Sequence, residues 1–346
     1  MKENSTTEDM DMEYRILGKT GLKVSRMGFG GIPIQRIDAA GTKALMHQLK
    51  DAGINYIDTA RGYTVSESYL GEALEGIREH FVLATKSMSR TKAAMAADIE
   101  TSLTNLRTGY IDLYQIHNPS TAQLEQVCGP DGALQALLEA KEAGKIGHIG
   151  VTAHSLEVFR MALDLEWVET IMFPYNIVET QGEKLMRKCA EKNIGFIAMK
   201  PLAGGAIEDA TLAMRFLFAN PDMTVAIPGM ADPKELVQNI AAAEDTAPLT
   251  AGEKTRILEI RNQLGTQFCR RCNYCAPCRE GIAIPSVFLF EGYLSRYGLA
   301  EWAKGRYAAM PVKASACIGC GACEARCPYG LPIRQMLKAA AEKFGE

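Results

Sequence analysis

Four side chains able to carry proton chemistry stand at or near the ends of short apolar runs in the first third of the sequence. The run INYID ends on Asp58, and Tyr63 follows five residues later. The runs FVLATK and IDLYQIH end on Lys86 and His117. Each residue alone would have an ordinary structural explanation, such as a cap or a strand end. Together, a carboxylate, a phenol, an ammonium and an imidazole predict one acid–base site.

The chemistry that fits these groups is reversible hydride transfer to a carbonyl. A hydride that reaches the carbonyl carbon leaves an alkoxide, which Tyr63 can protonate. A free phenol has a pKa near 10 and donates slowly, so we expect Lys86 to stabilise the phenolate and lower the pKa of Tyr63. Asp58 is expected to hold Lys86 in place, and His117 to polarise the carbonyl oxygen through a hydrogen bond.

The elements that must position these residues alternate between strand and helix patterns. Short runs rich in Ile, Leu, Val and Tyr are typical of buried parallel strands, and their carboxyl ends meet at one rim. Besides the three runs above, we expect a hairpin at 14–23 and strands at 24–31, 146–152, 168–173, 195–199 and 224–227. We expect helices at 39–52, 65–74, 91–107, 131–143, 155–163, 179–192, 209–219 and 233–243. The pattern predicts an α/β fold, a (β/α)8 TIM barrel with its active site at the carboxyl-terminal rim.

Composition divides the chain of 346 residues into three parts. Residues 1–12 are polar and acidic and predict a disordered tail, residues 13–250 hold the barrel pattern, and residues 251–346 hold a second domain. A net charge of -3 gives no sign of binding to nucleic acid or to an anionic membrane. No apolar stretch approaches the roughly 20 residues that span a bilayer. We expect a cytoplasmic protein, since no export signal is evident.

Eight of the ten cysteines fall in two runs within the second domain. Such spacing indicates metal or cluster ligands rather than disulfides. The second run has the bacterial ferredoxin spacing for [4Fe–4S] ligation, in which the fourth cysteine serves the other cluster. That rule predicts two clusters, one held by Cys269, Cys272, Cys275 and Cys327 and the other by Cys317, Cys320, Cys323 and Cys278. Zinc is the alternative, because separated Cys-x2-Cys pairs also bind zinc. The remaining two, Cys128 and Cys189, are expected to be a loop thiol and a helix thiol.

The first cysteine run departs from the ferredoxin pattern near Cys278, where two residues precede the last cysteine and Arg279 replaces the usual proline. The long segment between the two runs looks helical, as does the end of the chain. The domain therefore resembles an α-helical ferredoxin more than the compact β-rich type.

The segments INYIDTARGY, VLATKS and LYQIHNP resemble the active-site signatures of the aldo-keto reductase superfamily, and YRILGKTGLKVSRMGFGG resembles its N-terminal segment. The similarity runs from about residue 14 to residue 239. It implies an NAD(P)H-dependent carbonyl reductase on a (β/α)8 barrel, with the four residues above as its catalytic tetrad.

The resemblance also implies a nicotinamide site, although several positions differ from the family pattern. The Ser-Asn pair of the family falls on Thr152 and Ala153, so His154 is expected to replace the amide. Glu235 stands where NADP-dependent members have positive charge, which favours NAD(H), whereas Lys234 favours NADP(H). The implied cofactor residues are Gly30, Thr152, His154, Met172, Met199, Lys200, Pro201, Leu202, Gly204, Gly229, Glu235 and Asn239.

Two functional hypotheses follow. The first is a reductase of a small-molecule carbonyl, or the reverse alcohol oxidation, whose clusters transfer electrons, sense redox state or support structure. A ferredoxin-like protein is then a possible electron partner. The second is an electron-transfer or nicotinamide-sensing protein with a catalytically weak barrel. Nicotinamide transfers two electrons as a hydride while each cluster takes one, and the sequence shows no flavin site to connect them. The substrate and the oligomeric state are not encoded in any motif.

Overall fold

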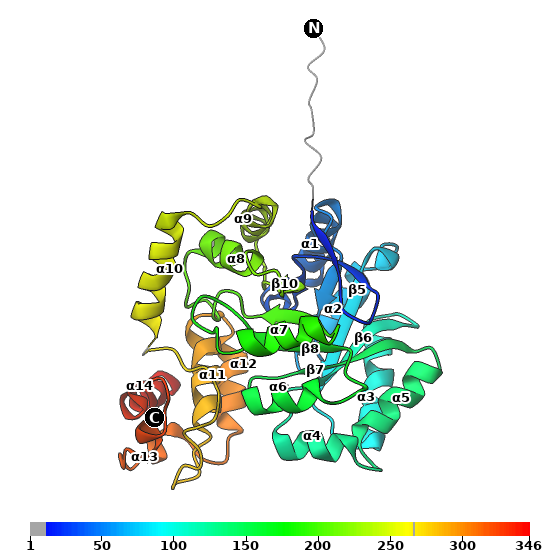
Figure 1. Ribbon diagram of the computed structural model, residues 1–346. Helices are drawn as coiled ribbons and strands as arrows, with labels where there is room; N and C mark the ends of the chain where they lie inside the picture. The colour runs from blue at the N-terminus through cyan, green and yellow to red at the C-terminus, as the bar shows by residue number, and fades with distance from the viewer. Residues whose placement is uncertain (1–11, 266) are drawn as a thin grey trace.

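A barrel of parallel strands forms the centre of the computed structural model, which describes residues 12–346 except residue 266 (Figure 1). Within these residues eight strands pair in chain order, each with the next. They are β3 (Phe29–Gly30), β4 (Tyr56–Asp58), β5 (Val82–Ser87), β6 (Ile111–His117), β7 (Ile146–Thr152), β8 (Thr170–Pro174), β9 (Gly195–Met199) and β10 (Val225–Ile227). Parallel bridges from Met27 to Ala226 and from Gly30 to Gly229 bring the two end strands together. The predicted (β/α)8 barrel is confirmed.

An antiparallel hairpin of β1 (Tyr14–Ile16) and β2 (Lys23–Ser25) covers the amino-terminal end of the barrel. Its Leu17 and Val24 are fully buried against the apolar side chains inside the barrel. The single strand predicted at 24–31 is wrong, because the chain passes there from the hairpin into the barrel. Arg26 receives a hydrogen bond from the Ala226 amide, and the barrel strand begins only at Phe29.

Helices surround the barrel and cover its strands (Figure 1). They are α1 (Ala39–Asp51), α2 (Ser66–Ala73), α3 (Lys92–Asn105), α4 (Thr121–Cys128), α5 (Ala133–Glu142), α6 (Leu156–Leu163), α7 (Glu183–Glu191), α8 (Ala210–Phe218) and α9 (Pro233–Glu244), with short 3-10 helices η1 (Ile32–Arg36) and η2 (Arg78–His80). Helix α4 was not predicted, although Ser120 and Gln123 form a capping box at its start. Cys128 is therefore the last residue of a helix rather than a loop thiol.

Helix α10 (Ala251–Leu264) packs on the barrel, although the composition changes before it. Ile257 and Ile260 are buried in one cluster with Leu212 of α8. The Arg215 Nε atom of α8 lies 2.5 Å from a carboxylate oxygen of Glu253. The change in composition near residue 250 thus precedes the change in packing by one helix.

The C-terminal region forms a separate group of helices beside the barrel (Figure 1). It contains α11 (Ile284–Ser295), α12 (Ala300–Ala308), η3 (Ala314–Ala316), α13 (Ala322–Ala325) and α14 (Ile333–Phe344). Helix α11 packs against both α12 and α14. The first cysteine run precedes α11, and the second lies between α12 and α14. The expected helical segments are confirmed.

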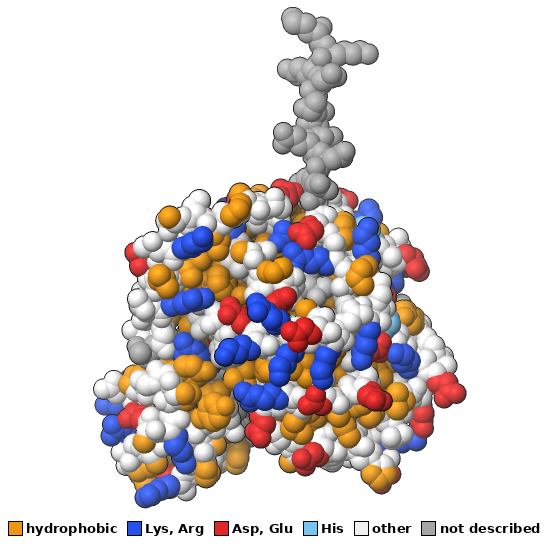
Figure 2. Space-filling model, in the orientation of Figure 1, with side chains coloured by type: hydrophobic (Ala, Val, Ile, Leu, Met, Phe, Trp, Pro, Cys, Tyr) orange, Lys and Arg blue, Asp and Glu red, His pale blue; other side chains and the backbone are white. Residues whose placement is uncertain are grey.

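The surface carries no large field of one sign on the face shown in Figure 2, where basic and acidic side chains are interspersed. No helix in the described part of the chain combines the length and apolar character required to cross a membrane. Residues 1–11 of the predicted tail lie outside the described residues. Met12, which the prediction also placed in the tail, is instead buried in the barrel core.

Candidate active site and cluster-binding segments

The structure brings the four predicted catalytic side chains to one cavity at the carboxyl-terminal rim of the barrel. Asp58 and His117 are the last residues of β4 and β6, and Lys86 is the next-to-last residue of β5. Tyr63 lies in the loop between β4 and α2. All four line a cavity of about 280 Å³. Neighbouring parallel strands place their carboxyl ends side by side, which explains the convergence.

Lys86 and Asp58 form a buried ion pair at the base of this cavity. Each is 2% exposed, and the Lys86 ammonium contacts the Asp58 carboxylate directly. The ammonium also donates to the carbonyl oxygen of Thr59 at 2.7 Å, and Gln115 donates to the second carboxylate oxygen at 3.0 Å. Burial lowers the pKa of Lys86 and raises the pKa of Asp58, while the attraction between them opposes both shifts.

Tyr63 and His117 meet edge to face beside this ion pair. Their ring centroids are 6.2 Å apart at an angle of 87°, and the Lys86 ammonium lies 4.9 Å from the Tyr63 centroid. Burial, followed by the charge of Asp58, raises the pKa of Tyr63 well above its ordinary value. The pKa of Tyr63 is thus raised in this structure rather than lowered as expected, because the phenolate would lose its hydration and face the Asp58 carboxylate.

His117 is held as a neutral imidazole. Burial, then the nearby positive charges of Lys86 and Arg90, lowers the pKa of His117 well below its ordinary value. The Arg90 guanidinium donates to the His117 carbonyl oxygen at 2.8 Å and fixes the backbone there. The His117 Nδ1 atom is buried and has no hydrogen-bond partner among the described residues. A neutral imidazole that lacks such a partner has hydrogen-bonding capacity to offer a ligand.

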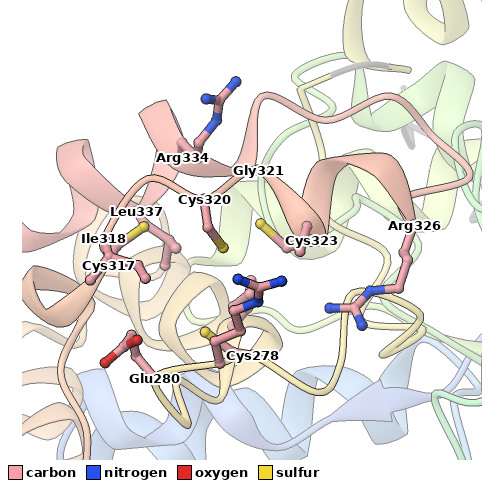
Figure 3. A pocket seen from close by; sticks show the side chains of 13 residues that line it. Cys278, Glu280, Cys317, Ile318, Cys320, Gly321, Cys323, Arg326, Arg334 and Leu337 are labelled. Carbon is pink, nitrogen blue, oxygen red and sulfur yellow. The ribbon is translucent and has the colours of Figure 1, made fainter.

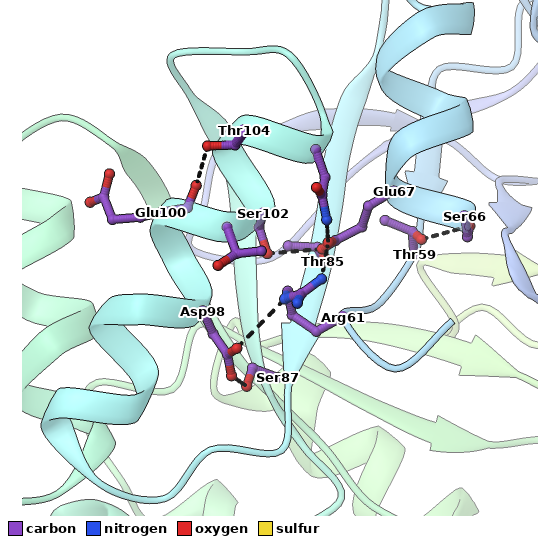
Figure 4. Close-up of polar contacts among 12 residues, drawn as sticks. Thr59, Arg61, Ser66, Glu67, Thr85, Ser87, Asp98, Glu100, Ser102 and Thr104 are labelled. Carbon is purple, nitrogen blue, oxygen red and sulfur yellow. Dashed lines mark hydrogen bonds and ion pairs between the residues drawn. The ribbon is translucent and has the colours of Figure 1, made fainter. Parts of the chain in front are cut away.

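A buried polar network holds the loop that carries Tyr63 (Figure 4). The Glu67 carboxylate, 2% exposed, accepts hydrogen bonds from Thr85 and Ser102 at 2.8 Å each and pairs with Arg61 at 2.8 Å. Arg61 lies two residues before Tyr63, so this ion pair anchors the loop to α2 and β5.

The sequence prediction missed Glu67, Arg61 and Gln115. Gln115 had a usable signal, because it lies two residues before His117 and therefore on the same face of the strand. Glu67 and Arg61 had none, since their partners come from distant segments.

Most of the predicted nicotinamide residues line the same cavity. They are Gly30, Thr152, His154, Met172, Met199, Lys200, Pro201, Leu202, Gly204, Gly229 and Glu235. Asn239 does not line it but is buried in α9, and its Oδ1 atom has no partner among the described residues. The buried Nδ1 atom of His154 is likewise without a partner there.

These residues fit an elongated polar ligand such as a nicotinamide dinucleotide. The unpartnered atoms of His154 and Asn239 need hydrogen bonds, which a ligand can supply. Two glycines of the cavity are packed closely against other lining residues. A Cβ atom at Gly229 would lie 2.7 Å from the Pro33 side chain, and one at Gly204 would lie 2.8 Å from the Tyr297 hydroxyl. Gly204 has a φ of +68°, a conformation that favours glycine.

Cysteines from both runs meet in the C-terminal region. Cys278, Cys317, Cys320 and Cys323 line one pocket of about 20 Å³, and Figure 3 shows these four side chains around it. This is one of the two predicted ligand sets. Arg326 lies at the same pocket and donates to the carbonyl oxygens of Cys275 and Pro277 at 2.7 Å each.

The thiols of the other predicted set also influence one another. Burial, then the charges of Cys269 and Cys272, raises the pKa of Cys275 to about 12. Burial raises the pKa of Cys272, and the neighbouring Cys327 adds to this shift. Among the described residues no three His, Cys, Asp or Glu side chains are arranged to bind a single metal ion. A [4Fe–4S] cube held by four thiolates does not require such an arrangement.

Comparison with known proteins identifies both parts of the chain. Residues 26–211, more than half of the 346, match the Aldo/keto reductase family. The chain belongs to the aldo/keto reductase family. Residues 268–332 match a 4Fe-4S dicluster domain, so this reductase carries an iron–sulfur domain after its barrel.

Known relatives of this aldo/keto reductase match between about half and three quarters of the chain. L-galactose dehydrogenase of Arabidopsis thaliana is 26% identical over 298 residues, which cover 70% of this chain and 92% of that protein. Aldo-keto reductase YhdN of Bacillus subtilis is 32% identical over 201 residues, 53% of this chain and 59% of that protein. The holo form of aldo-keto reductase AKR11C1 from Bacillus halodurans aligns with a TM-score of 0.63 at 26% identity, covering 72% of this chain and 96% of that one.

The iron–sulfur domain of this aldo/keto reductase family member contributes one wall of the cavity that holds the predicted tetrad. Leu289, Tyr293, Arg296, Tyr297, Trp302 and Arg306, all from α11, α12 and their connection, line it together with the tetrad. They lie outside the matched barrel segment. The sequence alone did not reveal them, because no local pattern shows that an insert between two cysteine runs will face a tetrad more than 160 residues earlier in the chain.

Proposed function

We propose that this reductase reduces a carbonyl compound, or oxidises the corresponding alcohol, by hydride transfer with a nicotinamide dinucleotide. The observation that carries the proposal is the convergence of Asp58, Tyr63, Lys86 and His117 on one cavity. The oxidoreductase family and the fit of the predicted cofactor residues support it.

In this proposal the bound nicotinamide supplies the hydride, and the protein supplies the proton and the orientation. Tyr63 donates its hydroxyl proton to the oxygen of the reacting carbonyl, since its raised pKa keeps it protonated at neutral pH. His117, neutral for the same pH range, donates a hydrogen bond that orients this oxygen. Lys86 stabilises the phenolate that remains on Tyr63, and Asp58 with Gln115 keeps Lys86 in position.

The replacement Tyr63→Phe tests this mechanism. We expect kcat to fall by about 10²–10⁴-fold, because the proton donor is lost, while the nucleotide Kd changes little. The measurement is anaerobic consumption of NADH or NADPH with a panel of aldehydes and ketones, and formation of NADH or NADPH from the oxidised nucleotides with a panel of alcohols. Tyr110→Phe, at an exposed tyrosine remote from the cavity, is the matched control and should retain activity.

The second hypothesis, a nicotinamide-sensing or electron-transfer protein, predicts a different outcome of the same experiment. Wild-type protein would then bind or oxidise NADH with reduction of its clusters and without carbonyl turnover. That result would replace the reductase proposal, whether or not a ferredoxin-like protein accepts the electrons.

We propose a preference for NAD(H) over NADP(H), based on Glu235. Its side chain lines the cavity at the start of α9, where it accepts hydrogen bonds from the amides of Ala231 and Asp232 at 2.7 and 3.2 Å. A carboxylate there repels a 2′-phosphate and can accept from ribose hydroxyls. Glu235→Gln keeps a capping residue but removes the charge, so we expect NADPH to bind about 10-fold tighter relative to NADH. Fluorescence titration measures the Kd values of NADH and NADPH. Glu191→Gln, at an exposed glutamate, is the control. Tighter binding of NADPH than of NADH by the wild type would overturn the preference.

For the clusters we propose two [4Fe–4S] centres with the ligand sets named above. The clusters could transfer electrons, sense redox state or support structure. The structural role is supported by the insert between the two cysteine runs, which forms a wall of the cavity that holds the tetrad. Electron exchange with a partner is compatible with this role but is not required by it.

A further inference from the structure

Arg306 lies at the catalytic end of the cavity. It comes from α12 of the iron–sulfur domain and faces the loop that carries Tyr63. A Cβ atom at Gly62, the residue before Tyr63, would lie 3.6 Å from the Arg306 Nη2 atom. The guanidinium carbon is 4.6 Å from the ring centroid of Trp302, which holds the side chain in this direction.

The charge of Arg306 is not balanced by a nearby carboxylate. On the same helix, Glu301 pairs with Lys304, and Glu291 on α11 pairs with Lys343 and Arg296. Across the cavity Asp58 pairs with Lys86. None of the ion pairs among the described residues involves Arg306, and its neighbours Tyr63 and His117 are neutral. A partly buried guanidinium without a counter-ion favours an anionic ligand, above all a carboxylate that it can bind through two hydrogen bonds.

The position of Arg306 separates it from the predicted cofactor residues. Arg296, by contrast, donates to the carbonyl oxygen of Gly204, which is one of those residues. Arg306 instead lies beside Gly62 and the tetrad, where the reacting carbonyl must bind. Its anion is therefore a group on the substrate rather than on the dinucleotide.

We propose that this reductase acts on carbonyl compounds that carry a carboxylate, and that Arg306 binds this carboxylate. Trp302 and Tyr293, which line the same wall, pack against the apolar part of the substrate. The inference rests on the proposed function, because it names the substrate class of the same site. Arg306 is then a specificity-determining residue supplied by the iron–sulfur domain.

A matched pair of aldehydes tests the proposal. 4-Carboxybenzaldehyde carries the carboxylate, and methyl 4-formylbenzoate is its neutral counterpart. We expect the wild type to have a KM at least 10-fold lower for the acid. Arg306→Gln should raise the KM for the acid by about 10–100-fold, which corresponds to about 1.4–2.8 kcal/mol, and leave the KM for the ester unchanged. Arg306→Lys should restore part of the difference in KM between the acid and the ester.

The control variant is Lys304→Gln, which removes an exposed cation from the same helix and should match the wild type. Equal KM values for acid and ester in the wild type, or an equal loss for both in Arg306→Gln, would overturn the proposal.

A binding measurement separates failure of this inference from failure of the proposed function. The sequence has two tryptophans, so Trp167→Phe leaves Trp302 as the only one, next to Arg306. Titration with 4-(hydroxymethyl)benzoate should change the fluorescence of Trp302 in a saturable way. The Kd for this acid should be at least 10-fold weaker in Arg306→Gln, and the Kd for its methyl ester should be at least 10-fold weaker in the wild-type background. If the protein binds the acid more tightly than the ester but turns over neither aldehyde, the reductase proposal is refuted and the carboxylate site is retained. If it turns over acid and ester equally well, or if no binding signal is seen, the carboxylate site is refuted.

Discussion

Tyr63 and His117 are both uncharged in the cavity although Lys86 lies beside them. Burial raises the pKa of Tyr63 and lowers the pKa of His117, so at neutral pH each group keeps a proton that it can donate. Lys86 is already paired with Asp58, and its charge therefore acts on a phenol that the surroundings hold in the acid form. In the proposed mechanism Tyr63 therefore holds the proton to be donated, and Lys86 stabilises the phenolate only after that proton has left.

The pH dependence of stability gives a prediction at this scale. The pKa of His117 in the folded protein lies well below the value of about 6.5 in the unfolded chain. Below pH 6.5 the unfolded chain therefore binds a proton that the folded chain does not, and the free energy of unfolding falls as the pH falls. We expect His117→Gln to reduce this loss by up to about 1.4 kcal/mol per pH unit.

The measurement is urea unfolding of the holoprotein at pH 5.5 and 7.5. His47→Gln, which alters an exposed histidine on α1, is the control and should keep the wild-type dependence. If His117→Gln leaves the change in the free energy of unfolding between pH 5.5 and 7.5 unaltered, His117 is accessible to protons in the folded protein.

At the level of elements, the start of α2 determines where Tyr63 lies. Glu67 ties Arg61, Thr85 and Ser102 to one carboxylate. We expect Glu67→Gln to lower the free energy of unfolding by about 3 kcal/mol, because it leaves the Arg61 guanidinium without its buried partner. It should also lower kcat, since the loop that carries Tyr63 loses its anchor.

Urea midpoints and turnover measure these effects. Glu72→Gln is the matched control on the same helix, because Glu72 pairs with Arg107 at the surface and should contribute less than about 1 kcal/mol. Equal effects of the two replacements would contradict a specific role for Glu67.

Elements with strong local signals were predictable from the sequence. The strands β7 and β9 have the predicted bounds, and α9 begins with Asp232 as N-cap and Pro233 at the first position, as its sequence indicates. The strand predicted at 24–31 failed because an apolar run does not reveal where a chain moves from one sheet to another. Helix α4 was missed because it is short, although the capping residue Ser120 was visible.

At the level of the whole molecule, the wall of α11 and α12 is flanked by the two cysteine runs, which we propose to hold it through the clusters. We expect removal of the clusters, by Cys320→Ser or by chelation of iron, to loosen this wall. The KM for substrates should then rise by about 10-fold or more, and proteases should cut between residues 279 and 316 more readily. Absorbance reports the loss of the clusters, steady-state kinetics the rise in KM, and limited proteolysis the exposure of the segment. Cys128→Ser, at the end of α4, is the control; intact kinetics after complete loss of iron would contradict a structural role.

The site was predictable where its residues lie at strand ends and unpredictable where it depends on contacts between domains. Asp58, Lys86 and His117 share a rim because parallel strands impose it. Arg306 reaches the same cavity only through the packing of α11 and α12 over the barrel. No periodicity or motif in residues 279–316 indicates which surface that segment will cover.

The wall that carries Arg306 is one uninterrupted segment, whereas the tetrad belongs entirely to the barrel. We therefore expect that exchanging the segment between Cys278 and Cys317 would change substrate selectivity and leave the proposed proton-transfer residues in place. For protein engineering this segment is a natural unit of replacement, because both of its ends adjoin predicted cluster ligands.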